Sequence, residues 1–314
     1  MFKHTRFVLY RIIHNKANLT VYLILIPLVM GMAIYFTNHV SENMRIGIVG
    51  NMHMIENEYI QYTYLDEMPK TSQMVLNQYD AIVVWENQDI KVISTKGEEF
   101  NQMVSSIING EATSTSLKTD ERGNATQIIG FLMMVVSLLG VQIYVYYFDE
   151  RNSIDKRILA TSIRYHQYML SHLIVVLCFL FLPAFIILLG AMILLHITLS
   201  IALWEFSLIL FLLCFFAASF GLWINALSQT LEESMMFGNM FAIVATVVSG
   251  GFVEVTHNEI FNHIIQILPQ RQMMLLLNAL ENGTAIPILG IVYVIVLSLI
   301  MIWIGVVVEK RRMS

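Results

Sequence analysis

Long apolar runs constrain the fold of this chain more than any other feature of its sequence. About 20 consecutive apolar residues are enough for a helix to cross the hydrocarbon core of a membrane. Hydrophobic residues make up 57% of the chain and charged residues only 13%, and few of the charges fall inside the runs. The pattern predicts an α-helical polytopic membrane protein with six transmembrane helices. They are expected at about Leu19–Phe36, Gln127–Phe148, His172–Leu195, Phe206–Leu227, Met235–Ser249 and Ile286–Val308.

The segments around these runs predict the domain organisation. Residues 1–17 mix basic and apolar side chains, which is typical of an amphipathic helix in the membrane interface. The first transmembrane helix, at 18–37, has no small-residue cleavage site after it, so we expect a retained anchor rather than a removed signal peptide. Residues 38–126 predict a small extracytoplasmic α/β domain, and residues 127–314 hold transmembrane helices 2–6. Within the latter, 252–284 predicts an outer re-entrant helical hairpin, because its two apolar stretches are too short to span.

The expected α/β domain carries local signals for both kinds of secondary structure. Runs of β-branched, aromatic and aliphatic residues bounded by polar turns are typical of strands. The expected strands are Arg45–Val49, Tyr59–Leu65, Ala81–Trp85 and Ile90–Ser94, and the expected helices are Lys70–Gln78 and Glu98–Asn109.

The distribution of Lys and Arg predicts the orientation in the membrane. Basic residues close to the ends of transmembrane helices mark the cytoplasmic side. They cluster in the N-terminal segment, in the loop after the second predicted span and at the C-terminus. These residues are Lys3, Arg6, Arg11, Lys16, Arg151, Lys156, Arg157, Arg164, Lys310, Arg311 and Arg312. We therefore expect both termini to be cytoplasmic and residues 38–126 to lie outside.

No motif for catalysis or for a bound cofactor is visible. The sequence has no G-x-x-x-x-G-K-[ST] phosphate loop, no G-x-S-x-G, no H-E-x-x-H and no C-x-x-C. His257 and His263 flank an apolar stretch but lack a third metal ligand. Cys178 and Cys214 lie inside apolar runs, where a free cysteine is usually a core side chain. We expect no catalytic, metal or cofactor site in this chain, and the net charge of -5 gives no indication of nucleic-acid binding.

The predicted spans carry uncharged polar groups where an ion-driven carrier would place ionisable ones. Their simplest role is hydrogen bonding between helices. Aromatic and methionine side chains, Tyr144 among them, would suit an apolar or amphipathic substrate, although each one alone more often packs against lipid or neighbouring helices. The candidate substrate path consists of Gln142, Tyr146, Phe237 and Asn239.

The loop after the second predicted span carries the most specific signal. It resembles the coupling-helix motif of the ABC-2 type transporter permeases, in which an acidic-basic start leads to L-L-A-T-P and then to a tyrosine. Residues of this chain that fit are Glu150, Arg151, Ile158–Thr161, Ile163, Arg164, Tyr168 and Ser171. Ser153, Ile154 and Ser162 depart from the Gly-Thr and Pro of that motif. The order of other pieces also agrees with the family: Pro27 in the first span, the strand Tyr79–Val84, Ser249–Val253 after the fifth span and Pro269–Leu280 before the last.

The resemblance implies the membrane subunit of an ABC exporter of the bacterial cell membrane. Such permeases dimerise, with a second copy or a related permease, and pair with a separate ABC ATP-binding subunit that holds ATP and Mg. Family members move drugs, antimicrobial peptides, lipids or polysaccharide precursors. The coupling helix is expected at 149–165, with ATPase contacts from Glu150, Arg151, Ile154, Arg157, Ile158, Leu159, Thr161 and Arg164.

Other functions stay open at this stage. A membrane-anchored sensor or assembly factor could use the extracytoplasmic domain to bind a ligand, and a neighbouring histidine kinase gene would favour it. A secondary carrier is disfavoured by the scarcity of ionisable residues inside the spans. A membrane enzyme is disfavoured because no acid, base and nucleophile cluster at a span end.

Overall fold

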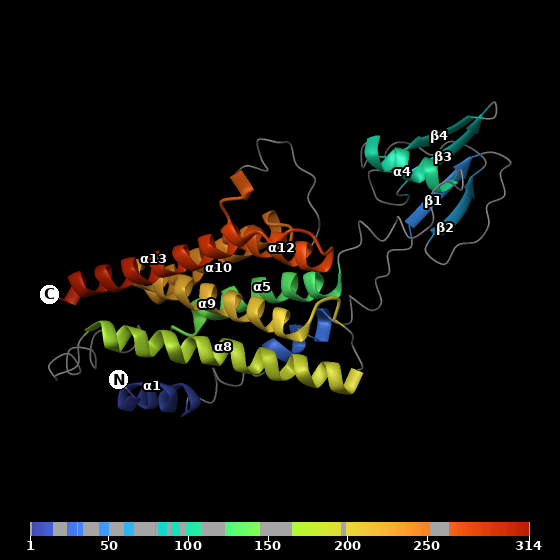
Figure 1. The fold of residues 1–314 in the computed structure, drawn as a ribbon. Coiled ribbons are helices and arrows are strands. Elements are labelled where there is room, and N and C mark those ends of the chain that lie inside the picture. Colours follow the sequence, from blue (N-terminus) through green and yellow to red (C-terminus); the bar gives the residue numbers. More distant parts are fainter. Residues whose placement is uncertain are drawn as a thin grey trace. The chain divides into compact units, whose positions relative to one another are not determined.

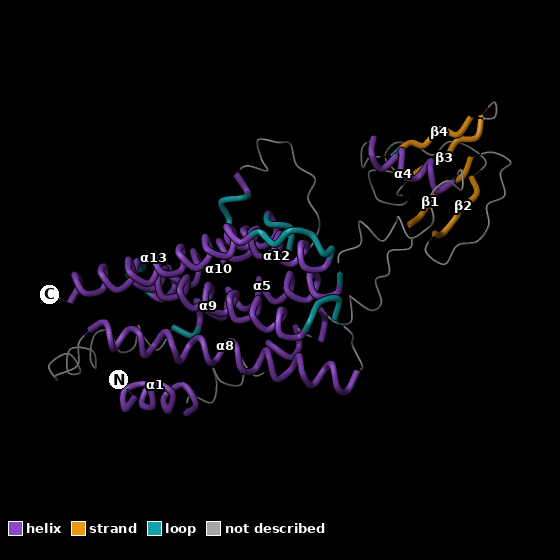
Figure 2. Tube along the Cα trace, in the orientation of Figure 1, coloured by secondary structure: helices purple, strands orange, loops and turns teal. Residues whose placement is uncertain are grey.

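The computed structural model divides the chain into two compact units, Met1–Thr37 with Arg122–Ser314, and Asn38–Glu121. Figures 1 and 2 show the first as helices and the second as a small sheet with a helix. The structure describes residues 2–14, 24–29, 31–33, 44–49, 60–65, 79, 81–86, 89–94, 98–108, 123–144, 165–195, 199–251 and 264–313.

The helical unit contains five helices that are long and apolar enough to cross a membrane. They are α5 (Asn124–Gln142), α8 (Tyr165–Leu195), α9 (Leu203–Leu227), α10 (Leu231–Val248) and α13 (Ile288–Met313). The prediction of a polytopic helical membrane protein is therefore confirmed at this level. The predicted first span lies only partly in the described chain, where 24–29 and 31–33 are helical and Ile26 and Ala33 are buried.

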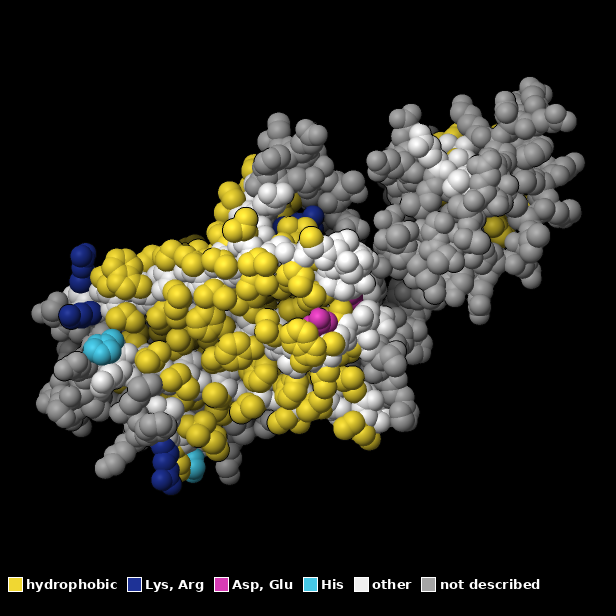
Figure 3. All heavy atoms as spheres, in the orientation of Figure 1, with side chains coloured by type: hydrophobic (Ala, Val, Ile, Leu, Met, Phe, Trp, Pro, Cys, Tyr) yellow, Lys and Arg dark blue, Asp and Glu magenta, His cyan; other side chains and the backbone are white. Residues whose placement is uncertain are grey.

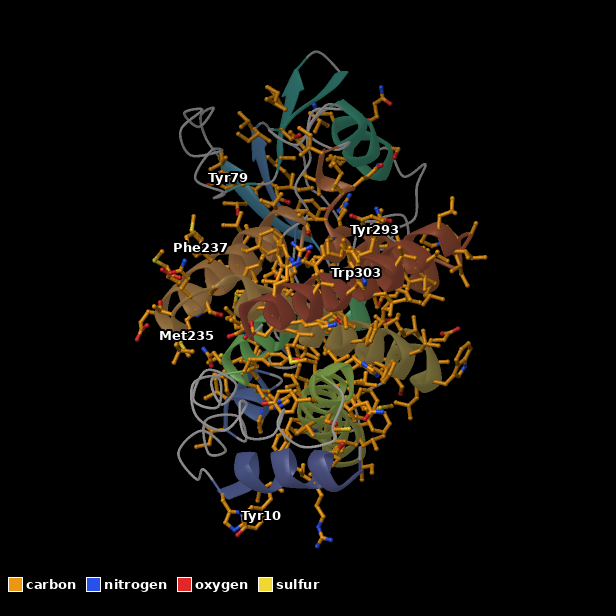
Figure 4. The ribbon with its side chains drawn as sticks, turned by 90° about the vertical axis from the view of Figure 1, so that its left-hand side faces the viewer. Tyr10, Tyr79, Met235, Phe237, Tyr293 and Trp303 are labelled. Carbon is orange, nitrogen blue, oxygen red and sulfur yellow. The ribbon has the colours of Figure 1, made fainter. Side chains whose placement is uncertain are left out.

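The core of this unit lies along α5 and α9. α5 packs against α9 and α10, while α13 packs along the opposite side of α9. α1 (Phe2–His14) lies along α8 with Val8 buried, and Tyr10 points away from it (Figure 4). Both ends of the chain lie at the end of the unit where α8 begins (Figure 1). Figure 3 shows hydrophobic side chains over the middle of the visible face, as expected for a surface that contacts lipid.

Several helices begin earlier than the sequence predicts. The first turns of α5 and α10 are polar, and their free backbone amides donate hydrogen bonds to side chains that cap these helices. α5 begins at Asn124, so the predicted boundary of the α/β domain at 126 falls inside a helix. α10 begins at Leu231, four residues before Met235, because the Thr230 hydroxyl accepts a hydrogen bond from the Glu233 amide while Glu233 caps in return. α8 begins at Tyr165 rather than at His172.

Pro269 begins a helix, as the resemblance implies for Pro269–Leu280. α12 (Pro269–Glu281) has the proline in its first turn, where no backbone N–H is required. Of the hairpin predicted at 252–284, residues 252–263 lie outside the described chain. The part that is described lies at the end of the unit where α5 begins, since α12 packs against both α5 and α13.

The second unit is a four-stranded sheet with one described helix. The strands β1 (Met44–Val49), β2 (Ile60–Leu65), β3 (Ala81–Glu86) and β4 (Asp89–Ile93) lie in the order β2-β1-β3-β4. β1 is parallel to β2 and β3, and β4 is antiparallel to β3. α4 (Glu98–Ile108) contributes Val104 to the core formed by Ile46, Ile48, Ala81 and Val83. The strands and α4 lie where the sequence predicts them, whereas Lys70–Gln78 lies outside the described residues. That this unit is extracytoplasmic stays a prediction.

Candidate functional site

The predicted coupling segment itself falls in the part of the chain that the structure does not describe. This holds for Glu150, Arg151, Ile154, Arg157, Ile158, Leu159, Thr161 and Arg164, and also for the path residue Tyr146. The structure does describe the two helices that the segment joins, α5 and α8, and the turn of Ile143 and Tyr144 at the end of α5. The candidate functional site is therefore the junction where α5 meets α9 and α10 beside this turn.

The backbones of α5 and α9 touch at this junction because both helices carry glycine there. A Cβ atom on Gly221 would lie 2.0 Å from the carbonyl oxygen of Gly140. A Cβ atom on Gly140 would lie 2.5 Å from the carbonyl oxygen of Ala217. Small residues four apart on a membrane helix, here Ala217 and Gly221, allow this close approach. The contact leaves no room for a side chain at Gly140 or Gly221 unless the two helices separate.

Two side chains lock the last turn of α5 to α9. The hydroxyl of Tyr144 donates a hydrogen bond of 3.1 Å to the carbonyl of Ala218, and the whole Tyr144 side chain is buried. The side-chain Nδ2 atom of Asn225 donates hydrogen bonds to the backbone carbonyl of Val141 at 3.2 Å and to that of Gly221 at 2.6 Å. The Val141 carbonyl lies in the last turn of α5 and also accepts a hydrogen bond of 3.3 Å from the backbone amide of Tyr144. Tyr144 and Asn225 thus hold the residues from which the undescribed loop departs.

α10 joins the junction through a face made of small residues. The residues it buries are Ser234, Gly238, Ala242, Ala245 and Thr246. A Cβ atom on Gly238 would lie 2.8 Å from both methyl groups of Val141. The Asn225 Oδ1 and Ser234 Oγ atoms are buried here and have no hydrogen-bond partner among the described residues.

The predicted path residues are brought partly together. Phe237 and Asn239 flank Gly238 on α10, and Gly238 packs on Val141, next to Gln142. Phe237 is 57% exposed and, with Met235, points away from the other helices (Figure 4). The Oδ1 atom of Asn239 is buried without a hydrogen-bond partner. These three residues therefore lie around one contact of α10 with α5, and whether cargo passes them stays a prediction.

Tyr144 has the packing role that the sequence favours for any single aromatic residue of the spans. It belongs to a group that would suit an apolar substrate, but its own ring packs inside the helical unit. Gly140, Gly221 and Asn225 were not singled out by sequence reasoning. The small-residue spacing of Ala217 and Gly221 was the available signal for the first two. Nothing in the sequence marks Asn225 as the partner of a carbonyl 84 residues away.

The described side chains of the junction carry no ionisable groups that could act as a metal or acid–base site. These side chains are apolar or neutral, and among the described residues no group of three His, Cys, Asp or Glu side chains could hold a metal ion. Charged side chains at the same end of the unit include Lys310 and Arg311 on α13, both exposed, and the buried Glu309. Figure 3 shows Lys, Arg and His side chains gathered toward this end.

Comparison with protein families gives one match that spans most of the chain. The model of the family described as "ABC-2 family transporter protein" matches residues 16–307. The match includes the undescribed loop, α5, α9 and α10. No curated protein matches the sequence.

Proposed function

This chain belongs to the ABC-2 transporter family, and we propose that it is the membrane-spanning permease subunit of an ATP-driven exporter. ATP and Mg bind to a separate ABC ATP-binding subunit, which docks on residues 149–165. The permease works as a dimer, with a second copy or a related permease, in a bacterial cell membrane. Its cargo is apolar or amphipathic, such as a drug, an antimicrobial peptide or a lipid.

The observation that carries this proposal is the rigid attachment of α5 to α9 beside the docking segment. A transporter driven by a partner must convert movement of a cytoplasmic loop into movement of helices in the membrane. Residues 145–164 lead directly from Tyr144, which is bonded to Ala218 on α9. A displacement of residues 145–164 would therefore move α5 and α9 together, because moving either helix alone would break the hydrogen bonds of Tyr144 and Asn225 between them.

The distribution of charge supports an orientation with this end in the cytoplasm. Lys310 and Arg311 lie at the end of α13, and α1 with its exposed Arg6 packs beside the start of α8. Basic residues close to the ends of transmembrane helices mark the cytoplasmic side, and these residues follow that rule.

The exposed face of α10 supports an apolar or amphipathic cargo. Side chains large enough to contact lipid or cargo point outward along it, opposite the small residues that face α5. They are Met236, Phe237, Met240, Phe241, Ile243, Val244 and Val247. Methionine and aromatic side chains adapt to ligands of varied shape, which suits a loosely defined substrate class.

The test is to break the docking segment without disturbing the membrane helices. The double variant Ile158→Asp/Leu159→Asp should insert and purify normally but should neither retain the ATP-binding subunit nor stimulate its ATP hydrolysis. His166→Asp is the matched control, since it adds a carboxylate at an exposed position just beyond the segment. Retention of the ATPase by the double variant, or transport by the purified chain alone, would refute the proposal.

A further inference from the structure

At the end of the helical unit where α5 begins, one carboxylate joins three parts of the chain. Glu281 is the last residue of α12, and its Oε1 atom accepts hydrogen bonds from the backbone amides of Ala125 at 2.9 Å and Thr126 at 3.2 Å. Its Oε2 atom accepts from the hydroxyl of Thr126, and Oε1 also accepts from the hydroxyl of Ser200 at 2.6 Å. One side chain thus joins α12, the first turn of α5 and the α8–α9 connection.

The start of α5 is built to receive this carboxylate from elsewhere in the chain. A helix usually begins with a residue whose own side chain caps the first free amides. Here that position is Gly123, which has no side chain, and no local cap is made. Gly123 has a φ of -62°, which any residue can adopt. Glycine at this position leaves room for the Glu281 carboxyl group, because a Cβ atom on residue 123 would lie 2.2 Å from it.

The helix dipoles favour the contact between the Glu281 carboxylate and the N-terminus of α5. The N-terminus of a helix carries a partial positive charge and its C-terminus a partial negative one. Glu281 is therefore unfavourable at the end of its own helix but favourable at the start of α5. Hydrogen bonds from backbone amides to a carboxylate are among the strong ones in proteins. The position of Glu281 thus favours the pairing of α12 with α5 over α12 alone.

Other contacts tie α12 across the same end of the unit. The guanidinium of Arg271 donates to the carbonyl of Ser249, at the end of α10, at 3.3 Å. The hydroxyl of Tyr293 on α13 donates to the carbonyl of Ile267, just before α12, at 2.6 Å (Figure 4). The side-chain Oδ1 atom of Asn278 lies 3.3 Å from the hydroxyl oxygen of Thr126. Among these residues, Glu281 is the one whose side chain binds backbone amides at the start of α5.

We propose that Glu281 is a positioning residue of the transporter, whose carboxylate fixes α12 to the start of α5 so that the two helices move as one body. The inference rests on the proposed function, because it assumes that α5 is displaced from its other end. The opposite possibility is a latch that opens during each cycle. The two differ in whether the amides of Ala125 and Thr126 stay protected while ATP is turned over.

Three variants distinguish the link between α12 and α5 from the capping of the first amides of α5. Glu281→Ala removes both the link and the cap. Gly123→Asp in the Glu281→Ala background returns a local cap for the Ala125 and Thr126 amides but not the link to α12. Space for that aspartate exists only once the Glu281 carboxyl group is gone. Glu281→Gln is the conservative variant, since its amide oxygen can still accept from both backbone amides.

The experiment uses the full chain with its ATP-binding subunit in lipid vesicles, with hydrogen exchange at residues 124–127 and ATP-driven movement of the amphipathic dye Hoechst 33342 as readouts. In Glu281→Ala we expect exchange to be faster by about tenfold or more, and dye movement per ATP hydrolysed to fall by a similar factor. In Gly123→Asp/Glu281→Ala we expect the amides of residues 124–127 to be protected from exchange again, while dye movement stays low. Glu281→Gln should transport within about threefold of the wild type.

Three results would overturn the inference. Recovery of transport in Gly123→Asp/Glu281→Ala would show that a capped α5 is enough. Normal transport in Glu281→Ala would show that the tie is dispensable. Loss of protection at Ala125 and Thr126 in the wild type during ATP turnover would show an opening latch. If the wild-type complex hydrolyses ATP without moving the dye, the substrate class proposed above fails, while the exchange data still decide between a fixed joint and a latch.

Discussion

Gly221→Ala should destabilise the helical unit far more than an alanine in a helix normally does. The new Cβ atom would lie 2.0 Å from the Gly140 carbonyl oxygen, against 3.4 Å for the onset of ordinary contact. The obstacle is backbone, so it cannot turn aside as a flexible side chain would. The helices would have to separate by about 1.4 Å at this point, the difference between 3.4 and 2.0 Å. The hydrogen bonds of Tyr144 and Asn225, at 3.1 and 3.2 Å, would then exceed bonding distance.

The magnitude follows from these terms. Overpacking in a close-packed interior costs about 1–3 kcal/mol. Each lost hydrogen bond costs about 1 kcal/mol. Alanine returns about 1 kcal/mol through its higher helix propensity. The net destabilisation expected is about 2–4 kcal/mol.

The assay compares three alanine substitutions in one helical unit. Unfolding of the full chain would be followed in mixed micelles by titration with a denaturing detergent. Gly190→Ala on α8 is the matched control, because a Cβ atom there has no neighbour within 4 Å; we expect it to be neutral or stabilising. Gly238→Ala should fall between them, since its Cβ atom would meet the Val141 methyl groups, which can move. If Gly221→Ala unfolds at the same detergent concentration as Gly190→Ala, the backbone contact does not have the role argued for it.

Two further substitutions test the caps and bonds at the same end. Tyr144→Phe should cost about 1 kcal/mol in the same titration, because only the hydrogen bond to Ala218 is lost and the ring still fills its place; an unchanged midpoint would contradict this. Thr230→Ala should also cost about 1 kcal/mol by removing the cap of α10, and proteolysis or exchange near Leu231 should increase. Equal exchange in the two proteins would show that Glu233 caps α10 unaided.

The sequence predicts most of the helices because the membrane imposes a length on them. α8, α9 and α13 contain apolar runs long enough to cross the hydrocarbon core, so periodicity and turn signals add little. The starts of α5 and α10 were predicted too late because their first turns are polar. Thr126 is fully buried, and a buried hydroxyl needs a partner that only the folded chain supplies, here Glu281.

The site was predictable only in its position along the chain. The coupling motif marks residues 149–165 through its resemblance to a family, and the match to residues 16–307 supports that family. The mechanical part of the site could not be predicted in the same way. A contact between the backbones of Gly140 and Gly221 depends on which faces of two helices meet, and a single sequence does not specify that pairing.

The two ends of α5 together determine how the helical unit can respond to a push at residues 145–164. One end is held to α9 by Tyr144, Asn225 and the glycine contact. The other is held to α12 by Glu281, and along the way Gly130 touches the backbone of Gly251. We expect the two ends of α5 to move together, because moving one end alone would break either the buried hydrogen bonds of Tyr144 and Asn225 or the part-buried ones of Glu281. We expect movement to be taken up by other helices, such as α10, which buries only small side chains on one face, and α8, of whose apolar stretch 33% is buried inside the unit.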